Sequence, residues 1–293
     1  MGLTFRTFFI CLVCYCSRLS AIGTQFLVFP ADAHDLAMGS HVAFGGSSSV
    51  NPALIESSKL GPSLYFNSGQ WYGDIRTSSV NYIHKIGKYN NRIFLRQAGV
   101  TDLEFREDSP SDNPKTTFAA YGFSVGSGVS YKTSIGQIGA TIRALYFTIY
   151  DQHSTGLTVD LGYSNIFENG WGMGLSLLNL GTVSKFYHEK PRLPNRILAG
   201  VSKELLLLKS INNRLYITSE FSSLHDAWKI KIGNHAQWKQ LRLLAGLSTT
   251  KHSSSLSFGS GFVYGRFGVT YAIRLGSQDI GVPQTLSISF QLP

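Results

Sequence analysis

The chain has 293 residues, a formal net charge of +9 at neutral pH and a mean hydropathy of +0.02. Only 15% of its residues are charged, against roughly 25% in soluble domains. No apolar stretch reaches the length of about 18 residues that predicts a membrane-spanning helix. The 30 glycines are spread along the whole chain, and Tyr and Phe are abundant. This composition excludes a helical membrane protein and is typical of a barrel whose strands face lipid and water alternately.

The positive charge is scattered along the chain, and no run of Lys and Arg exceeds two residues. Nucleic-acid binding requires basic residues gathered in a patch or stripe. We therefore expect no nucleic-acid partner, and we assign the basic residues to a solvated lumen and to the rims of a barrel.

Residues 1–23 have the pattern of a secretory signal peptide. Arg6 precedes an apolar run at 7–16, and small residues follow it. The run contains all three cysteines and is too short for a bilayer, which takes about 20 apolar residues. The run lacks the alternation of a strand, so we interpret it as a signal peptide and expect an exported protein. Removal of the signal peptide takes away Arg6, Arg18 and the cysteines, so we expect a mature protein with a net charge of +7 and no disulfide.

Residues 24–60 do not alternate between apolar and polar positions, and we expect them to form an N-terminal plug. Gly and Ser dominate residues 45–49. Asn51 is placed to cap a short helix that begins at Pro52, since proline suits the first helical position.

From residue 61 to the end of the chain, the pattern has a period of two residues. In the segment 267–275, large apolar residues occupy every odd position and small or polar residues every even one. Such alternation predicts half-buried strands, and Asn-Gly and related pairs supply hairpin turns between them. Short turns alternate with longer polar loops, such as 101–116 and 182–195. We predict an all-β fold, an antiparallel transmembrane β-barrel of about 14 strands spanning residues 61–293, although 12 to 16 strands fit the same pattern.

Aromatic residues gather at the ends of the predicted strands, as the interface girdles of membrane barrels do. The girdle residues are Trp71, Tyr72, Tyr146, Tyr150, Trp171, Phe186, Tyr187, Trp228, Trp238 and Tyr264. The alternatives are a soluble β-sandwich and a propeller. No motif repeats every 40–50 residues, which argues against the propeller.

One short motif is compatible with catalysis. Residues 122–126 match the G-x-S-x-G pattern around Ser124, which needs a helix directly after the serine. The residues that follow continue as a strand of small residues. We therefore predict no catalytic residue and no enzyme, and keep a barrel hydrolase built on Ser124 as a third hypothesis.

No spacing of side chains predicts a metal or a cofactor. The eight histidines are dispersed along the chain. The acidic residues Asp102, Glu104, Glu107 and Asp108 share a loop that lacks the glycine of a dedicated calcium site. The glycine-rich string at 259–265 lacks the spacing of a dinucleotide fingerprint.

Several short motifs are spread over the chain: Phe26-Leu27, Ala37-Met38-Gly39, Val42-Ala43, Asn51-Pro52-Ala53-Leu54, Leu178-Asn179-Leu180-Gly181, Leu193-Pro194 and the closing segments between Ser257 and Phe290. Together they resemble the PorV/PorQ family, outer-membrane barrels of the FadL-like superfamily associated with type IX secretion. The resemblance implies a bacterial outer-membrane protein that takes part, without enzymatic activity, in protein secretion or cell-surface attachment. Its implied partners are outer-membrane lipid and other secretion proteins or secreted cargo, with Met38, Gly39, Asn51 and Pro52 as a plug or partner motif.

The alternative is a FadL-like channel for the uptake of hydrophobic small molecules, with a possible hydrophobic ligand. Such a channel needs a lateral opening in its wall. Gly170, Gly172 and Gly174 alternate in one predicted strand, where they either kink the strand or pack closely against the plug.

Overall fold

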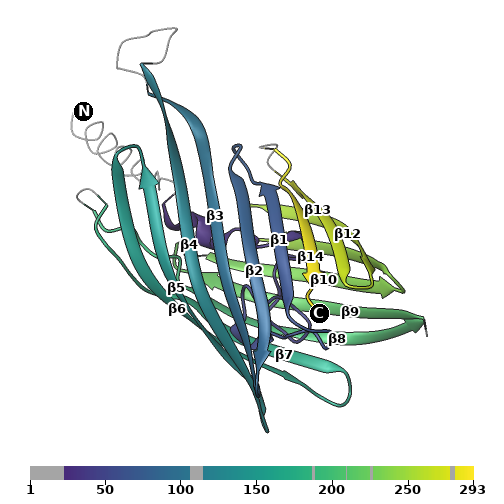
Figure 1. Cartoon of the computed structure of the whole chain (residues 1–293). Coiled ribbons are helices and arrows are strands. Elements are labelled where there is room, and N and C mark those ends of the chain that lie inside the picture. Colours follow the sequence, from purple (N-terminus) through teal and green to yellow (C-terminus); the bar gives the residue numbers. More distant parts are fainter. Residues whose placement is uncertain (1–22, 106–114, 187–188, 209, 225–226, 278–280) are drawn as a thin grey trace, which may run out of the picture.

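The computed structural model describes residues 23–105, 115–186, 189–208, 210–224, 227–277 and 281–293. Within these ranges, 14 strands form one closed antiparallel barrel (Figure 1). Each strand pairs with its neighbours in sequence, and β1 closes the barrel by pairing with β14 from Ser63 opposite Gln291 to Gln70 opposite Gln284. The prediction of an all-β barrel of about 14 strands is therefore confirmed.

The strands vary from 8 to 18 residues in length. They are β1 Ser63–Gln70, β2 Arg76–Ile86, β3 Tyr89–Phe105, β4 Thr116–Thr133, β5 Gly136–Ile149, β6 Gln152–Ile166, β7 Trp171–Val183, β8 Arg196–Leu208, β9 Ile211–Ser222, β10 Ala227–Trp238, β11 Leu241–Thr249, β12 Ser254–Tyr264, β13 Phe267–Gly276 and β14 Gln284–Gln291.

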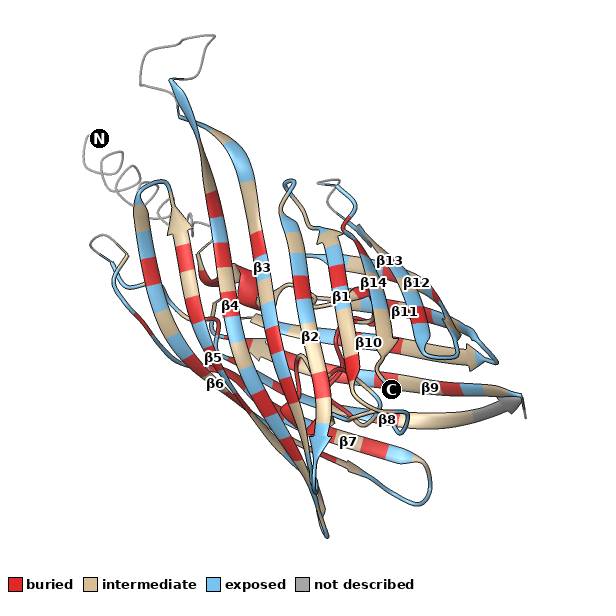
Figure 2. Cartoon of the chain, viewed as in Figure 1, coloured by how far each residue is buried: buried red, intermediate tan, exposed pale blue. Residues whose placement is uncertain are grey.

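Side-chain burial follows the period of the strands. In β13, Val269 and Tyr271 are exposed, whereas Gly268 and Ala272 on the opposite face are buried. Figure 2 shows the same alternation of red and pale-blue bands along the other strands. Successive side chains of a strand point to opposite faces. The outward-pointing side chains, which are largely apolar, therefore cover the outside of the barrel, and the inward-pointing side chains line the lumen.

The strands are joined differently at the two ends of the barrel. At one end, here called the short-turn end, two-residue turns such as 87–88 and 239–240 predominate, and the C-terminal Pro293 follows β14 there. At the other, the long-loop end, β3 is joined to β4 and β7 to β8 by the longer connections 106–115 and 184–195. This asymmetry is typical of outer-membrane barrels.

Most of the predicted girdle aromatics in the described ranges lie at strand ends on the outer face. Trp228 near the long-loop end is 63% exposed, and Tyr264 at the short-turn end is 71% exposed. Trp71 is an exception, because it turns inward and packs on Phe29 with 5.2 Å between ring centroids. Tyr187 lies outside the described residues.

The segment 23–62, here called the plug, runs through the lumen (Figure 1). It contains the 3₁₀ helix η1 (Thr24–Val28), the helix α2 (Ala33–Met38) and the 3₁₀ helix η2 (Pro52–Leu54). At the long-loop end, the Thr24 hydroxyl donates to the carbonyl of Arg192. At the short-turn end, the Leu292 amide donates to the carbonyl of Pro62.

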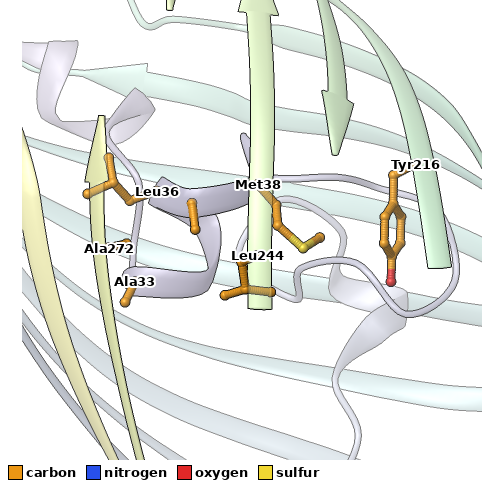
Figure 3. Close-up of a cluster of buried hydrophobic side chains, with 7 residues drawn as sticks. Ala33, Leu36, Met38, Tyr216, Leu244 and Ala272 are labelled. Atoms are coloured by element: carbon orange, nitrogen blue, oxygen red, sulfur yellow. The ribbon is translucent and has the colours of Figure 1, made fainter. Parts of the chain in front are cut away.

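The fully buried apolar side chains gather around the plug. In Figure 3, Leu36 and Met38 of α2 face Tyr216, Leu244 and Ala272 of the wall. Burying a leucine or methionine side chain contributes about 1.5–3 kcal/mol. The hydrophobic core is therefore the interface between plug and wall. No helix in the described ranges is long and apolar enough to cross a membrane.

Residues 1–22 lie outside the described ranges. The signal peptide and its removal therefore stay a prediction, as does the division of the chain at residues 23 and 60.

Candidate functional site

Asn51 is the most highly connected polar residue of the plug. Its side chain is fully buried, and its Oδ1 accepts from the Ala53 amide at 3.0 Å, which caps η2 as expected. Its Nδ2 donates to the carbonyl of Val42 at 2.7 Å and to that of Tyr163 in β6 at 2.9 Å. One amide side chain thus caps a helix, closes the loop between Val42 and Asn51, and joins that loop to the wall.

The wall has no side chain where Asn51 and Pro52 approach it. A Cβ added to Gly162 would lie 2.0 Å from Asn51 Oδ1, and one added to Gly139 would lie 2.3 Å from the Pro52 carbonyl carbon. Because such distances are never tolerated, only glycine permits this approach. The Asn-Pro pair of the plug and the glycines of β5 and β6 therefore form one structural unit.

Met38 and Gly39 end α2. Asp32 caps the start of this helix by accepting from the Asp35 amide at 2.8 Å. Gly39 ends it with a φ of 95°, a left-handed conformation that glycine adopts without strain. Met38 is 1% exposed and belongs to the core cluster of Figure 3. The structure therefore places all four predicted motif residues inside the lumen.

His41 links the plug to the opposite wall. Its ring is fully buried and stacks on Tyr216 with a centroid distance of 5.2 Å. Its Nε2 lies 2.8 Å from the Met38 carbonyl, which only accepts, so Nε2 carries the proton and Nδ1 accepts from the Thr218 hydroxyl. Burial, reinforced by the charge of Lys231, lowers the pKa of His41 to about 3. The ring is therefore neutral at physiological pH.

Two of the three alternating glycines pack closely against the plug. A Cβ on Gly174 would lie 1.9 Å from the Val42 carbonyl oxygen, and one on Gly172 would lie 2.9 Å from Phe44 Cβ. Gly170 lies in the β6–β7 turn with a φ of 79°. The sequence left two roles open for these glycines, a kink in the strand or close packing against the plug. Gly172 and Gly174 have the second role.

The irregularity in this part of the wall lies at Asn179 instead. Asn179 has a φ of 60°, and the β6–β7 register shifts between Val159 and Leu161. Asp160 Oδ1 accepts from the Asn179 amide at 2.7 Å, and Asn179 Nδ2 donates to the carbonyl of Pro194 at 2.8 Å. The Leu178–Gly181 motif and the Leu193-Pro194 pair, noted separately in the sequence, thus meet at a β-bulge.

A cavity of about 500 Å³ lies in the lumen between the plug and the 250–253 loop at the long-loop end. One part of the cavity lining is apolar, with Leu27, Val28 and Phe29 of the plug and with Trp71 and Phe94 of the barrel. Another part is basic, with Arg92, Arg96, Arg143, Arg196, Lys229, Lys231 and Arg274 from the strands and Lys251 from the 250–253 loop. The cavity therefore combines an apolar surface with a dense group of cations.

Three of these arginines hold the plug through its backbone carbonyls. Arg92 donates to Ser48 at 2.9 Å, Arg96 to Phe29 at 2.6 Å and Arg274 to Leu36 at 3.2 Å. Aromatic rings support two of the guanidinium groups, since Arg92 lies 4.7 Å from the Phe94 centroid and Arg274 lies 5.2 Å from that of Trp71.

Two carboxylates form ion pairs with the remaining arginines. Glu220 accepts two bonds from Arg196, at 2.7 and 2.9 Å, and lies 2.6 Å from Lys231 Nζ. Asp160 pairs with Arg143. Lys229 makes no hydrogen bond or ion pair with any residue that the structure describes.

Sequence reasoning missed this cavity because its residues come from separate strands. In the sequence these residues form part of a positive charge that is scattered along the chain. The available signal was strand parity: the basic residues that the strands contribute to the cavity alternate with outward apolar neighbours, as Arg92 and Arg96 do with Ile93 and Leu95. Parity gives the face of the sheet, but the height of each residue in the lumen depends on the strand register.

Asp32, His34 and Asp35 offer one potential ligand atom each, all within 4.8 Å of one another. Burial, followed by the neighbouring charge of Asp35, raises the pKa of Asp32 to about 7. Capping of α2 accounts for this arrangement, because Asp32 accepts from Asp35 and Asp35 Oδ2 accepts from the Ser49 hydroxyl.

The other sequence motifs form no chemical site in the described residues. Ser124 lies in the middle of β4, no helix follows it, and its buried hydroxyl has no partner among the described residues. Gly259 belongs to β12, where it packs on Ala37. Asp102 and Glu104 belong to β3, and the loop residues Glu107 and Asp108 lie outside the described ranges.

No protein-family model matches the chain, and no curated protein matches its sequence. Solved structures do match it. The CymD monoaromatic hydrocarbon channel aligns with a TM-score of 0.69 and 10% identity over 93% of this chain and 99% of that one. The toluene transporter TodX of Pseudomonas putida aligns with a TM-score of 0.66 and 11% identity over 90% of this chain and 98% of that one. The toluene transporter TbuX of Ralstonia pickettii aligns with a TM-score of 0.62 and 11% identity over 89% of this chain and 98% of that one.

The chain therefore shares the barrel fold of these channels. This likeness shows the fold, which is the one expected of a FadL-like barrel, and the comparisons do not single out the PorV/PorQ family. A closed barrel with an apolar outer face is typical of outer-membrane proteins.

Proposed function

We propose that this protein is a FadL-like channel through which small molecules with an apolar body cross the outer membrane. The observation that carries the proposal is the cavity of about 500 Å³ between the plug and the long-loop end of the lumen. Ligand sites of this kind are concave, largely apolar and about 300–1,000 Å³ in volume. The structural neighbours named as hydrocarbon channels and toluene transporters support the same interpretation.

The secretion role implied by the PorV/PorQ resemblance gains no support from these comparisons, so the channel is the function that we favour. The same neighbours support a hydrophobic ligand and a role without enzymatic chemistry. In this proposal Met38, Gly39, Asn51 and Pro52 hold the plug in place rather than contact an external partner.

Uptake of a labelled hydrophobic compound tests the channel. We expect cells that carry this barrel in the outer membrane to take up labelled toluene faster than cells with an empty vector. Ser248→Trp fills the cavity from β11 and should lower the rate severalfold. Ser260→Trp, on the lipid-facing side of β12, is the matched control and should leave the rate unchanged. If wild-type protein and empty vector gave equal uptake, the proposal would be wrong.

A further inference from the structure

The cavity carries far more positive than negative charge. Eight Lys and Arg side chains line it, and the ion-paired carboxylates Asp160 and Glu220 balance only two of them. Of the described residues, the next carboxylates are Asp32 and Asp35 of the plug, which form no ion pair. Even if both are counted as fully charged, four positive charges remain uncompensated.

These cations are held away from bulk solvent. Arg92 is 4% exposed, Lys231 5% and Arg143 7%, and the Nε atoms of Arg92, Arg143 and Arg274 are buried without a partner among the described residues. A buried charge is costly unless it is paired, and a guanidinium presents its donors in a planar fork that matches carboxylate and phosphate groups. An apolar ligand alone would leave this cost in place.

The apolar part of the same cavity defines the rest of the ligand. Phe94 lies against two guanidinium groups, at 4.7 Å from Arg92 and 5.5 Å from Arg143, and Trp71 lies against Arg274. Rings and cations therefore lie against one another in the lining of the cavity, and Phe29 faces the cavity from the plug. A flat apolar body would stack on the rings while its acid groups reach the cations.

We propose that the cavity binds a small organic anion with at least two acid groups, carboxylate or phosphate, on a compact ring-containing body. The inference rests on the proposed channel function and specifies its substrate class. A single acid group would compensate only one of the surplus charges, whereas a multiply charged ligand compensates several at once and gains charge-assisted hydrogen bonds.

Lys229 is the best position at which to test the binding of an anion in the cavity. It lines the cavity and makes no hydrogen bond or ion pair with the described residues, so Lys229→Gln removes a cation without freeing the plug. Lys88→Gln is the matched control, because Lys88 lies outside the cavity, in the β2–β3 turn at the short-turn end, where its ammonium group contacts the ring of Tyr89 and the ring and hydroxyl of Tyr131.

The experiment measures binding by calorimetry on the full-length purified barrel in neutral detergent. The probes are benzene-1,3,5-tricarboxylate, benzoate, toluene and inorganic pyrophosphate. We expect the tricarboxylate to bind at least tenfold more tightly than benzoate or toluene, and more tightly than pyrophosphate, which lacks a ring. Lys229→Gln should weaken tricarboxylate binding at least fivefold, and Lys88→Gln should leave it unchanged. Band shifts on unboiled gels establish that each variant is folded.

The outcomes separate the inference from the proposed function. Tight binding and uptake of toluene without tricarboxylate binding would overturn the inference and leave the channel standing. Equal effects of Lys229→Gln and Lys88→Gln would also overturn it, because binding would then lie outside the cavity. Tighter binding of pyrophosphate than of the tricarboxylate would refute the ring-containing body. Absence of both binding and uptake for every probe would contradict the inference and the channel together.

Discussion

Asn51 concentrates three hydrogen bonds in one buried side chain, which makes it the most informative single position of the plug. Asn51→Ala removes all three and leaves the carbonyls of Val42 and Tyr163 without this donor. An unsatisfied buried polar group costs about 1–3 kcal/mol. We expect the plug to become sensitive to protease while the barrel keeps its heat-modifiable migration on gels. Asn212→Ala, at an exposed position of β9, should change neither property. Equal loss of folded barrel in Asn51→Ala would show that the residue is needed for barrel assembly.

His41 makes the seating of the plug depend on pH. Its pKa of about 3 in the folded protein lies below the ordinary value of 6.5, so the unfolded state binds more protons between these values. The stabilisation from neutral His41 is therefore complete above pH 6.5 and is lost as the pH falls toward 3. The part of the protection from hydrogen exchange at residues 36–44 that depends on His41 should therefore shrink as the pH falls.

His41→Gln isolates this contribution, because glutamine does not titrate. Asp32 acts in the opposite direction: its pKa of about 7 lies above 3.8, so its effect lowers stability as the pH rises from 3.8 to 7. The ratio of the exchange rates of His41→Gln and wild type at the same pH cancels both the intrinsic chemistry of exchange and the effect of Asp32, and it should change between pH 4 and 7. A ratio that is constant over this range would show that His41 does not titrate in the plug.

At the scale of elements, the glycines of the strands decide how closely the plug approaches the wall. Gly174→Ala places a Cβ 1.9 Å from the Val42 carbonyl oxygen, so the plug must move although alanine is no worse than glycine in a strand. We expect a higher conductance in planar bilayers than for the wild-type barrel. Ala144→Val, on the outer face of β5, enlarges a strand residue away from the plug and should leave the conductance unchanged. A wild-type conductance for Gly174→Ala would mean that the plug does not block the pore at this point.

The same elements show what a sequence determines by itself. Alternation predicted the strands because side-chain direction in a strand depends only on residue parity, and Asn51 was predicted as a helix cap because capping is local. The meeting of Asn179 with Pro194, or of Arg92 with Arg274 in one cavity, depends on register and barrel closure. The inward turn of Trp71 likewise depends on Phe29, a residue far away in the chain. Such long-range contacts are absent from local patterns.

At the scale of the whole molecule, the barrel separates two environments with opposite requirements. Closure of β1 on β14 leaves no strand edge, so the backbone groups of the wall are paired within the sheet. The outer face is apolar, whereas the lumen contains the ion pairs and the basic cavity. The fold therefore concentrates charge in the lumen beside the plug and leaves the outer face apolar.

A charge on the outer face tests this separation directly. Val125 lies near the middle of β4, points outward and is 43% exposed. Arginine on the lipid face costs about 2–4 kcal/mol at the bilayer midplane and about 0–1 kcal/mol near the interfaces. Val125→Arg should therefore lower the free energy of unfolding from vesicles in urea by about 2–4 kcal/mol.

Ile135→Arg is the control at a different depth, since Ile135 lies in the β4–β5 turn at the short-turn end and is 71% exposed. It should lower the same free energy by less than about 1 kcal/mol, because arginine at an interface remains in contact with water. The contrast between these positions requires lipid against the middle of β4. If both variants unfolded at the wild-type urea concentration, the apolar outer face would be covered by something other than a bilayer.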